Sequence, residues 1–300
     1  MKVIITKICS NLGKLISSIL HRKFEVAGFD TRAGTELPAD VKVFAMDIRR
    51  KKTRDIFRKL NGDAVIHIPD NSDVSLEVFS ALLQLISDYH IQRLILVSNA
   101  SVYGARPDNP QFITEDHPIL GGSRLSSSRN LVEIDMLAQA SFLNNPSCNL
   151  TILRPVNIVG YINSPIMNFF KMKKPYTALG FDPMFQLTHA RDLAEAISVS
   201  LESNAKGIFN IAGNGQIPLS KILKNLGIKS VPIPSPLIST ASKTMEFLGT
   251  RNSFPLPVDF LMYNCMVDTS KAKQILNFEP RFNISECIET VREIILWNFR

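Results

Sequence analysis

Cysteine and histidine, the side chains most often found in metal sites and covalent catalysis, are too scattered in this sequence to form a motif. The 300-residue chain has four cysteines and five histidines. No C-x-x-C, H-x-x-x-H or H-x-E pattern occurs, so we expect neither a metal site nor a disulfide framework. No apolar run approaches the ~20 residues that span a bilayer. The sequence therefore predicts a cytoplasmic protein without metal and without a transmembrane segment.

A basic cluster gives the chain a candidate site for an anion. All but one of the residues from Arg49 to Arg54 are lysine or arginine, and the formal net charge is +7. A solvated surface between a strand and a helix explains such a run. A site for a phosphate, an acidic partner or a membrane surface also explains it. No aromatic residues alternate with the basic ones, so we expect no nucleic-acid binding.

The order of apolar runs predicts strands that alternate with helices from Val3 to about Leu153. Such alternation requires right-handed crossovers and gives a parallel sheet covered on both faces. The sequence therefore favours an α/β fold with a doubly wound parallel sheet. Strands are expected over 3–6, 24–29, 41–45, 63–67, 93–97 and 149–153, and helices over 11–20, 53–60, 74–89 and 127–142.

The pattern changes after about Asn157, where loops lengthen and prolines cluster. Short helices are expected over 190–201, 220–226, 236–248 and 285–297. We therefore expect a first domain over 1–157, to which a strand and a helix return near 185–212. A smaller, mostly helical lobe is expected over 158–300.

A functional site is expected where the carboxyl ends of the strands meet. In an open parallel sheet, ligands bind beyond these ends, at the point where the strand order reverses. The helix that begins at Asn11 presents its N-terminal N–H groups there, which favours an anion. The loops concerned follow Thr6, Phe29, His67, Val97 and Leu153.

Seven segments carry a resemblance to a known family. They are V-I-I-T-x-x-x-S-x-L-G, G-F-D-x-R, M-D-I-R, A-V-I-H-I-P, L-V-S-N-A-S-V-Y-G, I-L-R-P-V-N-I-V-G and T-H-A-R-D-L-A-E-A-I. In this order, from Met1 to about Ile211, the chain resembles the extended short-chain dehydrogenase/reductases of the NAD-dependent nucleotide-sugar epimerase/dehydratase type. The resemblance implies a Rossmann-type domain that holds NAD(P). It also implies a C-terminal substrate lobe for a nucleotide-linked sugar or a similar small molecule.

The turn after the first strand departs from the family pattern T-G-x-x-G-x-x-G. Thr6 and Gly13 match it, but Lys7 and Ser10 replace its first two glycines. A side chain at these places strains a tight turn and takes up room beside the pyrophosphate. The cofactor contacts that the resemblance implies here are Asn11, Leu12 and Gly13.

Other cofactor positions match better. Asp30 stands where the family has the acid that binds the adenosine ribose, and its charge favours NAD over NADP, a preference that Arg32 would weaken. Turn capping is the alternative role for Asp30. Asp47 and Ile48 match the pair that flanks adenine. Pro69, like Ile68 before it, replaces a small residue of the cofactor wall.

All four catalytic positions of the family are substituted. Asparagine, serine or threonine, tyrosine and lysine are replaced here by Ser75, Asn99, Leu125 and Arg129. Leucine has no proton to give, and arginine does not titrate near neutrality. The retained charge of Arg129 is expected to hold ribose or phosphate oxygens of the cofactor, and the catalytic residues stay unassigned. We interpret His67 and His189 as structural residues.

Three functions follow from these patterns. The first is an NAD-binding, epimerase/dehydratase-like protein that is catalytically impaired. The second is an active oxidoreductase whose acid/base chemistry has moved to another residue, with Tyr103 as the candidate. The third is a non-catalytic sensor or scaffold that contacts a partner through Arg49–Arg54 or through Phe169–Phe170 and the lysines that follow. The Phe169–Phe170 segment is also interpreted as a helix end that lines the substrate entrance, which is the preferred role. The resemblance also implies a possible homodimer through the helices expected over 74–89 and 127–142.

Overall fold

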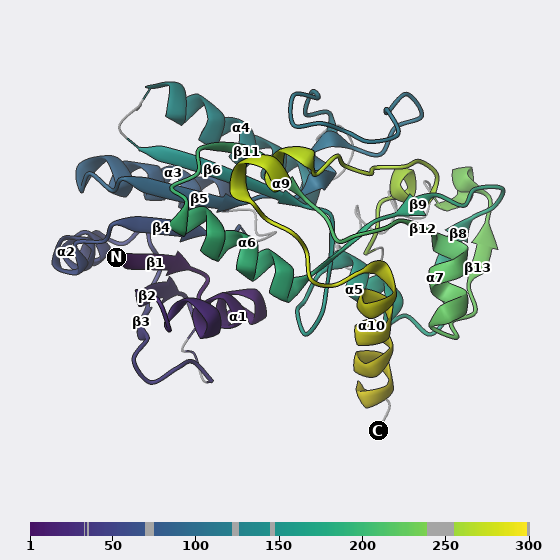
Figure 1. The fold of residues 1–300 in the computed structure, drawn as a ribbon, viewed down its shortest axis with the longest axis horizontal. Coiled ribbons are helices and arrows are strands. Elements are labelled where there is room, and N and C mark those ends of the chain that lie inside the picture. Colours follow the sequence, from purple (N-terminus) through teal and green to yellow (C-terminus); the bar gives the residue numbers. More distant parts are fainter. Residues whose placement is uncertain are drawn as a thin grey trace.

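The computed structural model describes residues 1–32, 34, 36–69, 75–121, 126–144, 148–238 and 255–298, with only the backbone of 126–128, 142–144 and 298. Its centre is a seven-stranded sheet in the order β11-β6-β5-β4-β1-β2-β3, and every neighbouring pair is parallel (Figure 1). The strands are β1 (Lys2–Thr6), β2 (Glu25–Asp30), β3 (Lys42–Ala45), β4 (Ala64–His67), β5 (Arg93–Val97), β6 (Asn149–Pro155) and β11 (Gly207–Ile211). The chain builds outward from β1 to β3 and then crosses to β4 on the other side of β1, so the strand order reverses between β1 and β4.

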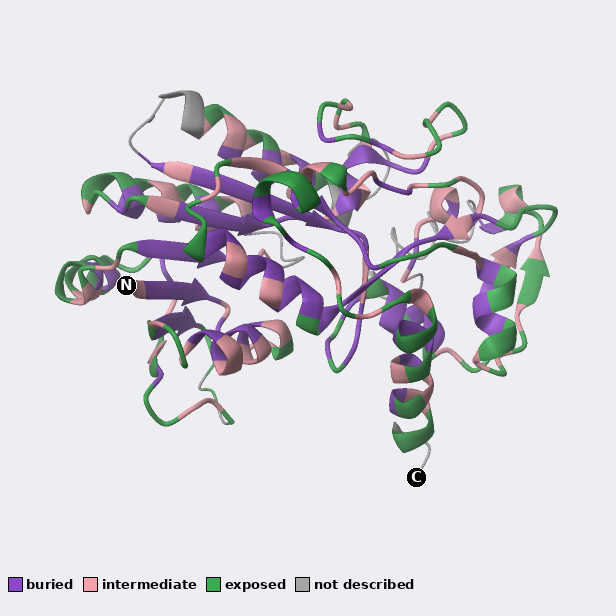
Figure 2. Cartoon of the chain, viewed as in Figure 1, coloured by how far each residue is buried: buried purple, intermediate pink, exposed green. Residues whose placement is uncertain are grey.

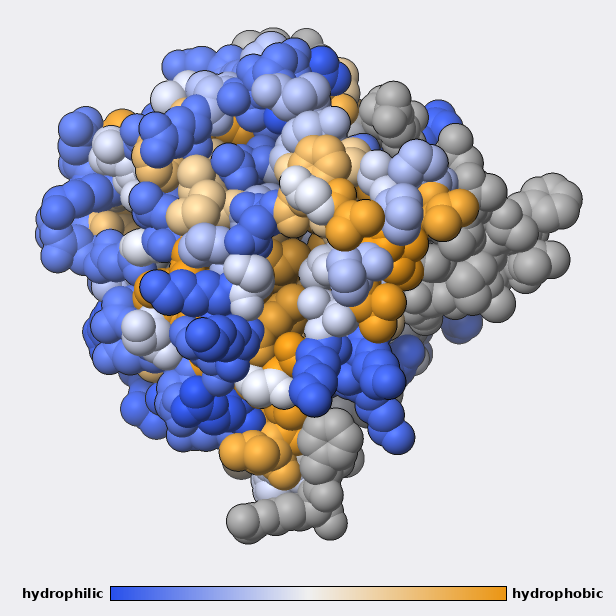
Figure 3. All heavy atoms as spheres, turned by 90° about the vertical axis from the view of Figure 1, so that its right-hand side faces the viewer, coloured by the Kyte–Doolittle hydropathy of each residue, from blue (hydrophilic) through white to orange (hydrophobic). Residues whose placement is uncertain are grey.

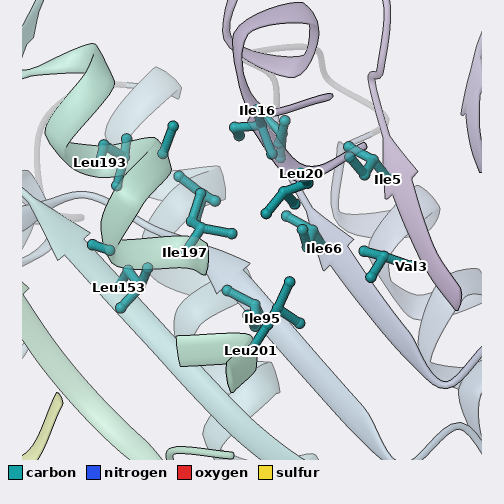
Figure 4. Packing of buried hydrophobic residues seen from close by; sticks show 14 of the residues in the cluster. Val3, Ile5, Ile16, Leu20, Ile66, Ile95, Leu153, Leu193, Ile197 and Leu201 are labelled. Atoms are coloured by element: carbon teal, nitrogen blue, oxygen red, sulfur yellow. The ribbon is translucent and has the colours of Figure 1, made fainter. Parts of the chain in front are cut away.

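Helices cover both faces of the sheet because the strands are apolar on both sides. The helices α1 (Asn11–Leu20) and α6 (Ala190–Glu202) pack side by side on one face, where Ile16, Leu20 and Ile197 meet strand residues (Figure 4). The other face is covered by α2 (Lys51–Leu60), α3 (Ser75–Asp88) and α4 (Ser126–Asn144). Buried strands lie between helices with exposed outer faces (Figure 2), as expected for a doubly wound sheet.

A second core lies in the C-terminal lobe. It is formed by α5 (Pro165–Phe170), α7 (Leu219–Asn225) and α10 (Ile284–Asn298), together with the 3-10 helix η3 (Val258–Leu261). Three two-stranded pairs join these helices. They are β7 (Asn157–Val159) with β10 (Leu187–His189), β8 (Tyr176–Ala178) with β13 (Val231–Ile233), and β9 (Met184–Phe185) with β12 (Ile217–Pro218). These pairs are additions to the mostly helical lobe that the sequence predicts, because strands of two or three residues are too short to show alternation.

The predicted fold class, a Rossmann-type doubly wound sheet, is confirmed, and most element boundaries fall within two residues of the prediction. The helix expected over 236–248 lies mostly outside the described residues. The segment that returns to the sheet contains β10, α6 and β11, and α9 (Ser270–Leu276) packs beside β11. The division of the chain at residue 157 stays a prediction. Within the described part of the chain, no helix is long and apolar enough to cross a bilayer.

Candidate functional site

A pocket lies at the carboxyl ends of β1 to β4, at the edge where the strand order reverses. All its lining residues fall between Thr6 and Val78. They include Lys7, Asp30, Asp47, Ile48, His67 and Ser75. Three of the residues expected to bind the cofactor, Asp30, Asp47 and Ile48, therefore line one common pocket.

A second hollow lies at the opposite edge of the sheet, beside the amino ends of β5 and β6. It is wider than the first and polar, with Arg93, Asn149 and Asn204 in its wall. Its polar groups already bond within the chain, because Arg93 donates to the carbonyl of Leu201 at 2.8 Å and Asn149 to Asn204 at 3.0 Å. The edge where parallel sheets bind ligands is the carboxyl one, so the first pocket is the candidate site.

The turn between β1 and α1 adopts a backbone conformation that normally requires glycine. Lys7 has a φ of 55°, in the left-handed region that a side chain disfavours. Ser10 is the N-cap of α1, and its hydroxyl accepts from the N–H of Gly13 at 3.0 Å and donates to the carbonyl of Lys7 at 2.7 Å. With Lys7 and Ser10 in place of the family's two glycines, the backbone of the turn is strained at Lys7. The two hydrogen bonds of the Ser10 hydroxyl hold the turn together.

Gly13 allows α1 to begin directly against the end of β1. A Cβ at this position would lie 2.3 Å from the carbonyl oxygen of Lys7 and 2.8 Å from the Cα of Ile8. Both are backbone atoms, so neither can rotate away. Asn11 and Leu12 form the first turn of α1, whose N–H groups carry the positive end of the helix dipole.

Asp30 is the last residue of β2 and is 6% exposed. It accepts hydrogen bonds from the backbone N–H of Cys9 at 3.0 Å and of Arg32 at 3.1 Å. These bonds tie the turn before α1 to the end of β2 and fix the carboxylate in the pocket wall. Asp30 therefore has a turn-capping role and lines the pocket at the same time, while the side chain of Arg32 is exposed.

Asp47 follows β3 and holds the first residue of the basic cluster. Its carboxylate accepts from the Arg49 guanidinium at 2.7 Å and 3.0 Å, and the same guanidinium reaches Glu77 on α3 at 2.7 Å. The hydrogen bond from Arg49 is the main reason that the pKa of Asp47 lies below its usual value. Arg54 pairs with Asp88 at 3.4 Å. The cluster thus spans the N-cap and first turn of α2, with Arg49 and Arg54 engaged in ion pairs.

His67 and Ile68 form a bulky pocket wall at the end of β4, and hydrogen bonds connect this wall to Thr6. The hydroxyl of Thr6 lies 2.9 Å from Nδ1 of His67 and accepts from the N–H of Ile68 at 3.1 Å. The ring of His67 is 2% exposed and packs on Phe79, with 4.9 Å between ring centroids. His67 is therefore buried and packed within the protein, as expected from the sequence, and it also lines the pocket. Pro69 is half-buried and follows this wall.

The family's catalytic positions are scattered in the structure. Ser75 is buried at the start of α3 and lines the pocket. The side chain of Asn99 caps the 3-10 helix η1 (Ala100–Tyr103), where it accepts from the N–H of Ser101 at 2.8 Å. Arg129 has a 70% exposed side chain that pairs with Glu133 at 2.8 Å, so it does not line the pocket. Leu125 lies outside the described residues.

A buried polar network follows β5 and β6. Arg154 is 1% exposed, and its guanidinium donates to both carboxylate oxygens of Asp135 on α4, at 2.7 Å and 3.0 Å. It also donates at 2.8 Å to the hydroxyl of Tyr103, which in turn donates to Asn210 at 2.8 Å. Burial is the main reason that the pKa of Tyr103 is raised. The hydroxyl of Tyr103 is therefore fully buried and bonded within the protein, and relocated acid/base chemistry at Tyr103 stays a prediction.

No role was assigned to Arg154 or Asp135 in the sequence analysis. A signal for both was present, because each charged residue interrupts an apolar pattern. Arg154 follows I-L in a buried strand, and Asp135 stands beside Ile134 on the buried face of α4. A lone charge in such a run needs a buried partner of opposite sign. The partner itself could not be read from the sequence, since it depends on how α4 packs on β6.

His189 ends β10 and caps α6. Its Nδ1 accepts from the N–H of Arg191 at 3.2 Å, and its ring stacks on Phe282 with 3.7 Å between centroids. Burial, followed by the charge of Arg191, lowers the pKa of His189 to about 4. His189 is therefore a neutral interior residue. Among the described residues, no group of three metal-ligating side chains is placed to hold a metal ion.

The apolar surface proposed for a partner does not exist as expected. Phe169 and Phe170 are 0% and 1% exposed, because both pack in the core of the C-terminal lobe. Their position at the end of α5 buries them against Tyr176 and α10. Other apolar side chains do reach the surface of this lobe (Figure 3). The prediction that Phe169 and Phe170 contact a partner is therefore wrong, because both side chains are covered.

The pocket combines a carboxylate with apolar side chains. Asp30 offers a carboxylate to hydroxyl groups, and Met46, Ile48 and Val78 offer apolar surface to a planar base. Asn11, Leu12 and Gly13 of α1 are not among the lining residues, although the turn that leads to α1 contributes Lys7.

Comparisons with known proteins agree with this fold. Residues 13–212 match the family model described as NAD dependent epimerase/dehydratase family. An uncharacterised Mycobacterium tuberculosis protein is 24% identical over 206 residues, which cover 66% of this chain and 53% of that protein. The chain thus spans about half the length of the first curated relatives it matches. UDP-glucuronate 4-epimerase of Thermodesulfobacterium geofontis is 24% identical over 82% of this chain and 76% of its own.

Solved structures show the same architecture at low identity. UDP-glucose 4-epimerase from Bifidobacterium longum, in complex with NAD+ and UDP, has a TM-score of 0.77 at 17% identity and covers 99% of both chains. dTDP-glucose 4,6-dehydratase from Bacillus anthracis, in complex with NAD, has a TM-score of 0.77 at 16% identity, over 99% of this chain and 97% of its own. Likeness at this level establishes the fold. Because the family model matches two thirds of the sequence, the chain belongs to the NAD dependent epimerase/dehydratase family.

Proposed function

We propose that this chain is a nucleotide-sugar epimerase/dehydratase-like protein that binds NAD but does not carry out the proton transfer of its family. The observation that carries the proposal is the pocket at the ends of β1 to β4, with Asp30 fixed in its wall. The family and fold support a dinucleotide ligand, since relatives of the same fold are described in complex with NAD.

The residues proposed to hold the dinucleotide come from three turns. Backbone N–H groups of Asn11 and Leu12 would meet the pyrophosphate, and Gly13 leaves room for its approach. Asp30 would accept from the adenosine ribose hydroxyls, and its charge disfavours the extra phosphate of NADP. The remaining proposed contacts are Asp47 and Ile48, beside the adenine, and Arg32 and Pro69 at the rim.

The loss of catalysis is proposed from what the family's catalytic positions now do. Asn99 caps a 3-10 helix and Arg129 pairs with Glu133 on the outer side of α4. Removing a general acid or base typically lowers a rate by ~10²–10⁴. Bound NAD supplies hydride chemistry in this family, but no described side chain here is assigned to move the accompanying proton.

The proposal also includes a substrate class, an oligomeric state and a cellular location for the protein. A nucleotide sugar is the proposed substrate class, because structural relatives are described with UDP or UDP-sugars. A homodimer through α3 and α4, which pack together within one chain, stays a proposal that light scattering tests. The cytoplasm stays the proposed location.

Calorimetric titration with NAD, NADH, NADP and NADPH tests the binding proposal. We expect binding of NAD and NADH, weaker binding of NADP, and loss of binding in Asp30→Asn. Asp55→Asn is the matched control, because Asp55 is an exposed carboxylate on α2 that pairs with Arg58. No binding of any dinucleotide at about 1 mM would overturn the proposal, leaving the sensor or scaffold function.

Turnover is measured separately, with UDP-glucose and UDP-glucuronate in the presence of NAD. We expect no epimerised or dehydrated product above the rate without protein. Product formation at the rate of ordinary enzymes, about 1–10³ per second, would show that the acid/base chemistry is intact.

A further inference from the structure

We infer that the pocket recognises an adenosine diphosphate group and that the nicotinamide half of a dinucleotide adds little to its affinity. The ligand class then includes ADP-ribose and ADP as well as NAD. This inference rests on the proposed function, because it concerns the same pocket. It goes beyond that proposal because it assigns the affinity to the adenosine diphosphate half of the ligand.

The first observation is where the pocket lining comes from. Every lining residue lies between Thr6 and Val78, on β1 to β4, α3 and the turns between them. The sequence predicted a site lined by five loops, including those after Val97 and Leu153. Neither of these two loops contributes to the pocket wall. Within the described part of the chain, the pocket therefore ends where the adenosine half of a dinucleotide would end.

The second observation is that the polar side chains after β5 are turned into the protein. Ser98 is 3% exposed and donates its hydroxyl hydrogen to Asp135. The amide oxygen of Asn99 accepts from the N–H of Ser101, and Tyr103 is held between Arg154 and Asn210. The hydroxyl hydrogens of Ser98 and Tyr103 are already donated within the protein, so one of these bonds would have to break before either hydroxyl could donate to a ligand.

The third observation comes from α4. Its buried acid, Asp135, is saturated by Arg154, Ser98 and Gln139. Its cation, Arg129, lies on the exposed side with Glu133. The described part of α4 therefore presents to the end of the sheet a closed ion pair rather than a group that would orient a carboxamide or a charged ring.

These observations have a common physical consequence. A ligand group gains affinity only when its polar atoms exchange water for partners in the protein. In the pocket the adenosine half would meet the Asp30 carboxylate and apolar walls. The diphosphate would meet the N-terminus of α1, which begins at Asn11, beyond the pocket residue Lys7. The nicotinamide half meets side chains that are already bonded, so it stays largely solvated.

Calorimetry with a series of ligand fragments tests the inference. We expect ADP-ribose to bind within about fivefold of NAD, ADP to bind measurably, and nicotinamide mononucleotide not to bind at about 1 mM. Asp30→Asn should weaken ADP-ribose and NAD by the same factor, and Asp55→Asn should weaken neither.

The outcomes separate this inference from the proposed function. If NAD binds more than about fivefold tighter than ADP-ribose, the inference fails and the proposed function stands. If ADP-ribose binds and NAD does not, both fail, because the inference also requires NAD to bind with an affinity close to that of ADP-ribose. If no ligand of the series binds, both fail.

Discussion

The two halves of the carboxyl edge of the sheet use their polar side chains in different ways. At the ends of β1 to β4, Asp30 and Ser75 line a pocket while bonding to, or packing against, the backbone around them. At the ends of β5, β6 and β11, Tyr103, Arg154 and Asn210 bond to one another out of contact with solvent. One half has a pocket, and the polar groups of the other half are bonded to one another inside the protein. The comparison teaches that polar side chains at one edge of a sheet line open space in one place and pair with each other in another.

Breaking the buried pair has the largest expected effect on the core half. Arg154→Met leaves Asp135 as an uncompensated buried carboxylate, which typically costs about 3–5 kcal/mol of unfolding free energy. The expected result is a loss of this size in denaturant unfolding, with the affinity for NAD unchanged in the fraction that stays folded.

A matched exposed pair provides the control for Arg154→Met. Arg129→Ala removes an ion pair whose arginine side chain is 70% exposed, so the change should stay within about 1 kcal/mol. The double variant Arg154→Met/Asp135→Leu should recover stability relative to Arg154→Met alone. A small effect of Arg154→Met would mean that this half is not consolidated core.

Adding a side chain at Gly13 tests the half of the edge that contains the pocket. In Gly13→Ala the added Cβ meets the carbonyl of Lys7 at 2.3 Å, so α1 must shift. Overpacking of this kind typically costs about 1–3 kcal/mol. We expect this loss in thermal unfolding together with weaker NAD binding, because the turn moves with the helix. Unchanged affinity would show that the turn before α1 does not hold the ligand.

Acid should weaken the fold through His189. Its pKa in the folded chain is about 4, against 6.5 for an ordinary histidine, so the unfolded chain binds a proton first as pH falls. The stability that the neutral ring contributes is complete above pH 6.5 and is lost toward pH 4, about 2 kcal/mol of it by pH 5. His189→Asn keeps a capping side chain and should flatten the pH dependence of unfolding over this window. An unchanged slope would show that groups other than His189 dominate the loss of stability in acid.

Relieving the strain at Lys7 has the smallest expected effect. Lys7→Gly removes a side chain from a left-handed position, which should raise stability by up to about 1 kcal/mol. Lys14→Gly, inside α1, is the control and should lower stability by about 1 kcal/mol. If both variants lose stability alike in thermal unfolding, Lys7 carries no strain.

The sheet and its helices were predictable because they repeat a strong local signal. The helix over 11–20 and the strand over 93–97 match α1 and β5 residue for residue, since apolar spacing alone defines them. The pairs β7–β10, β8–β13 and β9–β12 were not predictable. Their strands are too short for a period, and their pairing depends on segments distant in sequence.

The position of the site was predictable from the sequence, but the residues that line it were less so. The ends of β2 and β3 placed Asp30 and Asp47 in the pocket, because parallel strands end at one edge. Arg129 was assigned from a spacing within α4, but the rotation of the helix decides which side of it faces the sheet. That rotation is fixed by the burial of Asp135 and Ile134, which leaves Arg129 outside.

Saturation-transfer NMR of NAD bound to the intact chain tests the central claim most directly, because it reports which part of the ligand touches the protein. The account predicts strong transfer to the adenine protons and to the adjoining ribose, and much weaker transfer to the nicotinamide ring protons. Equal transfer to both rings would contradict it, since the half of the edge described as closed core would then be holding the nicotinamide.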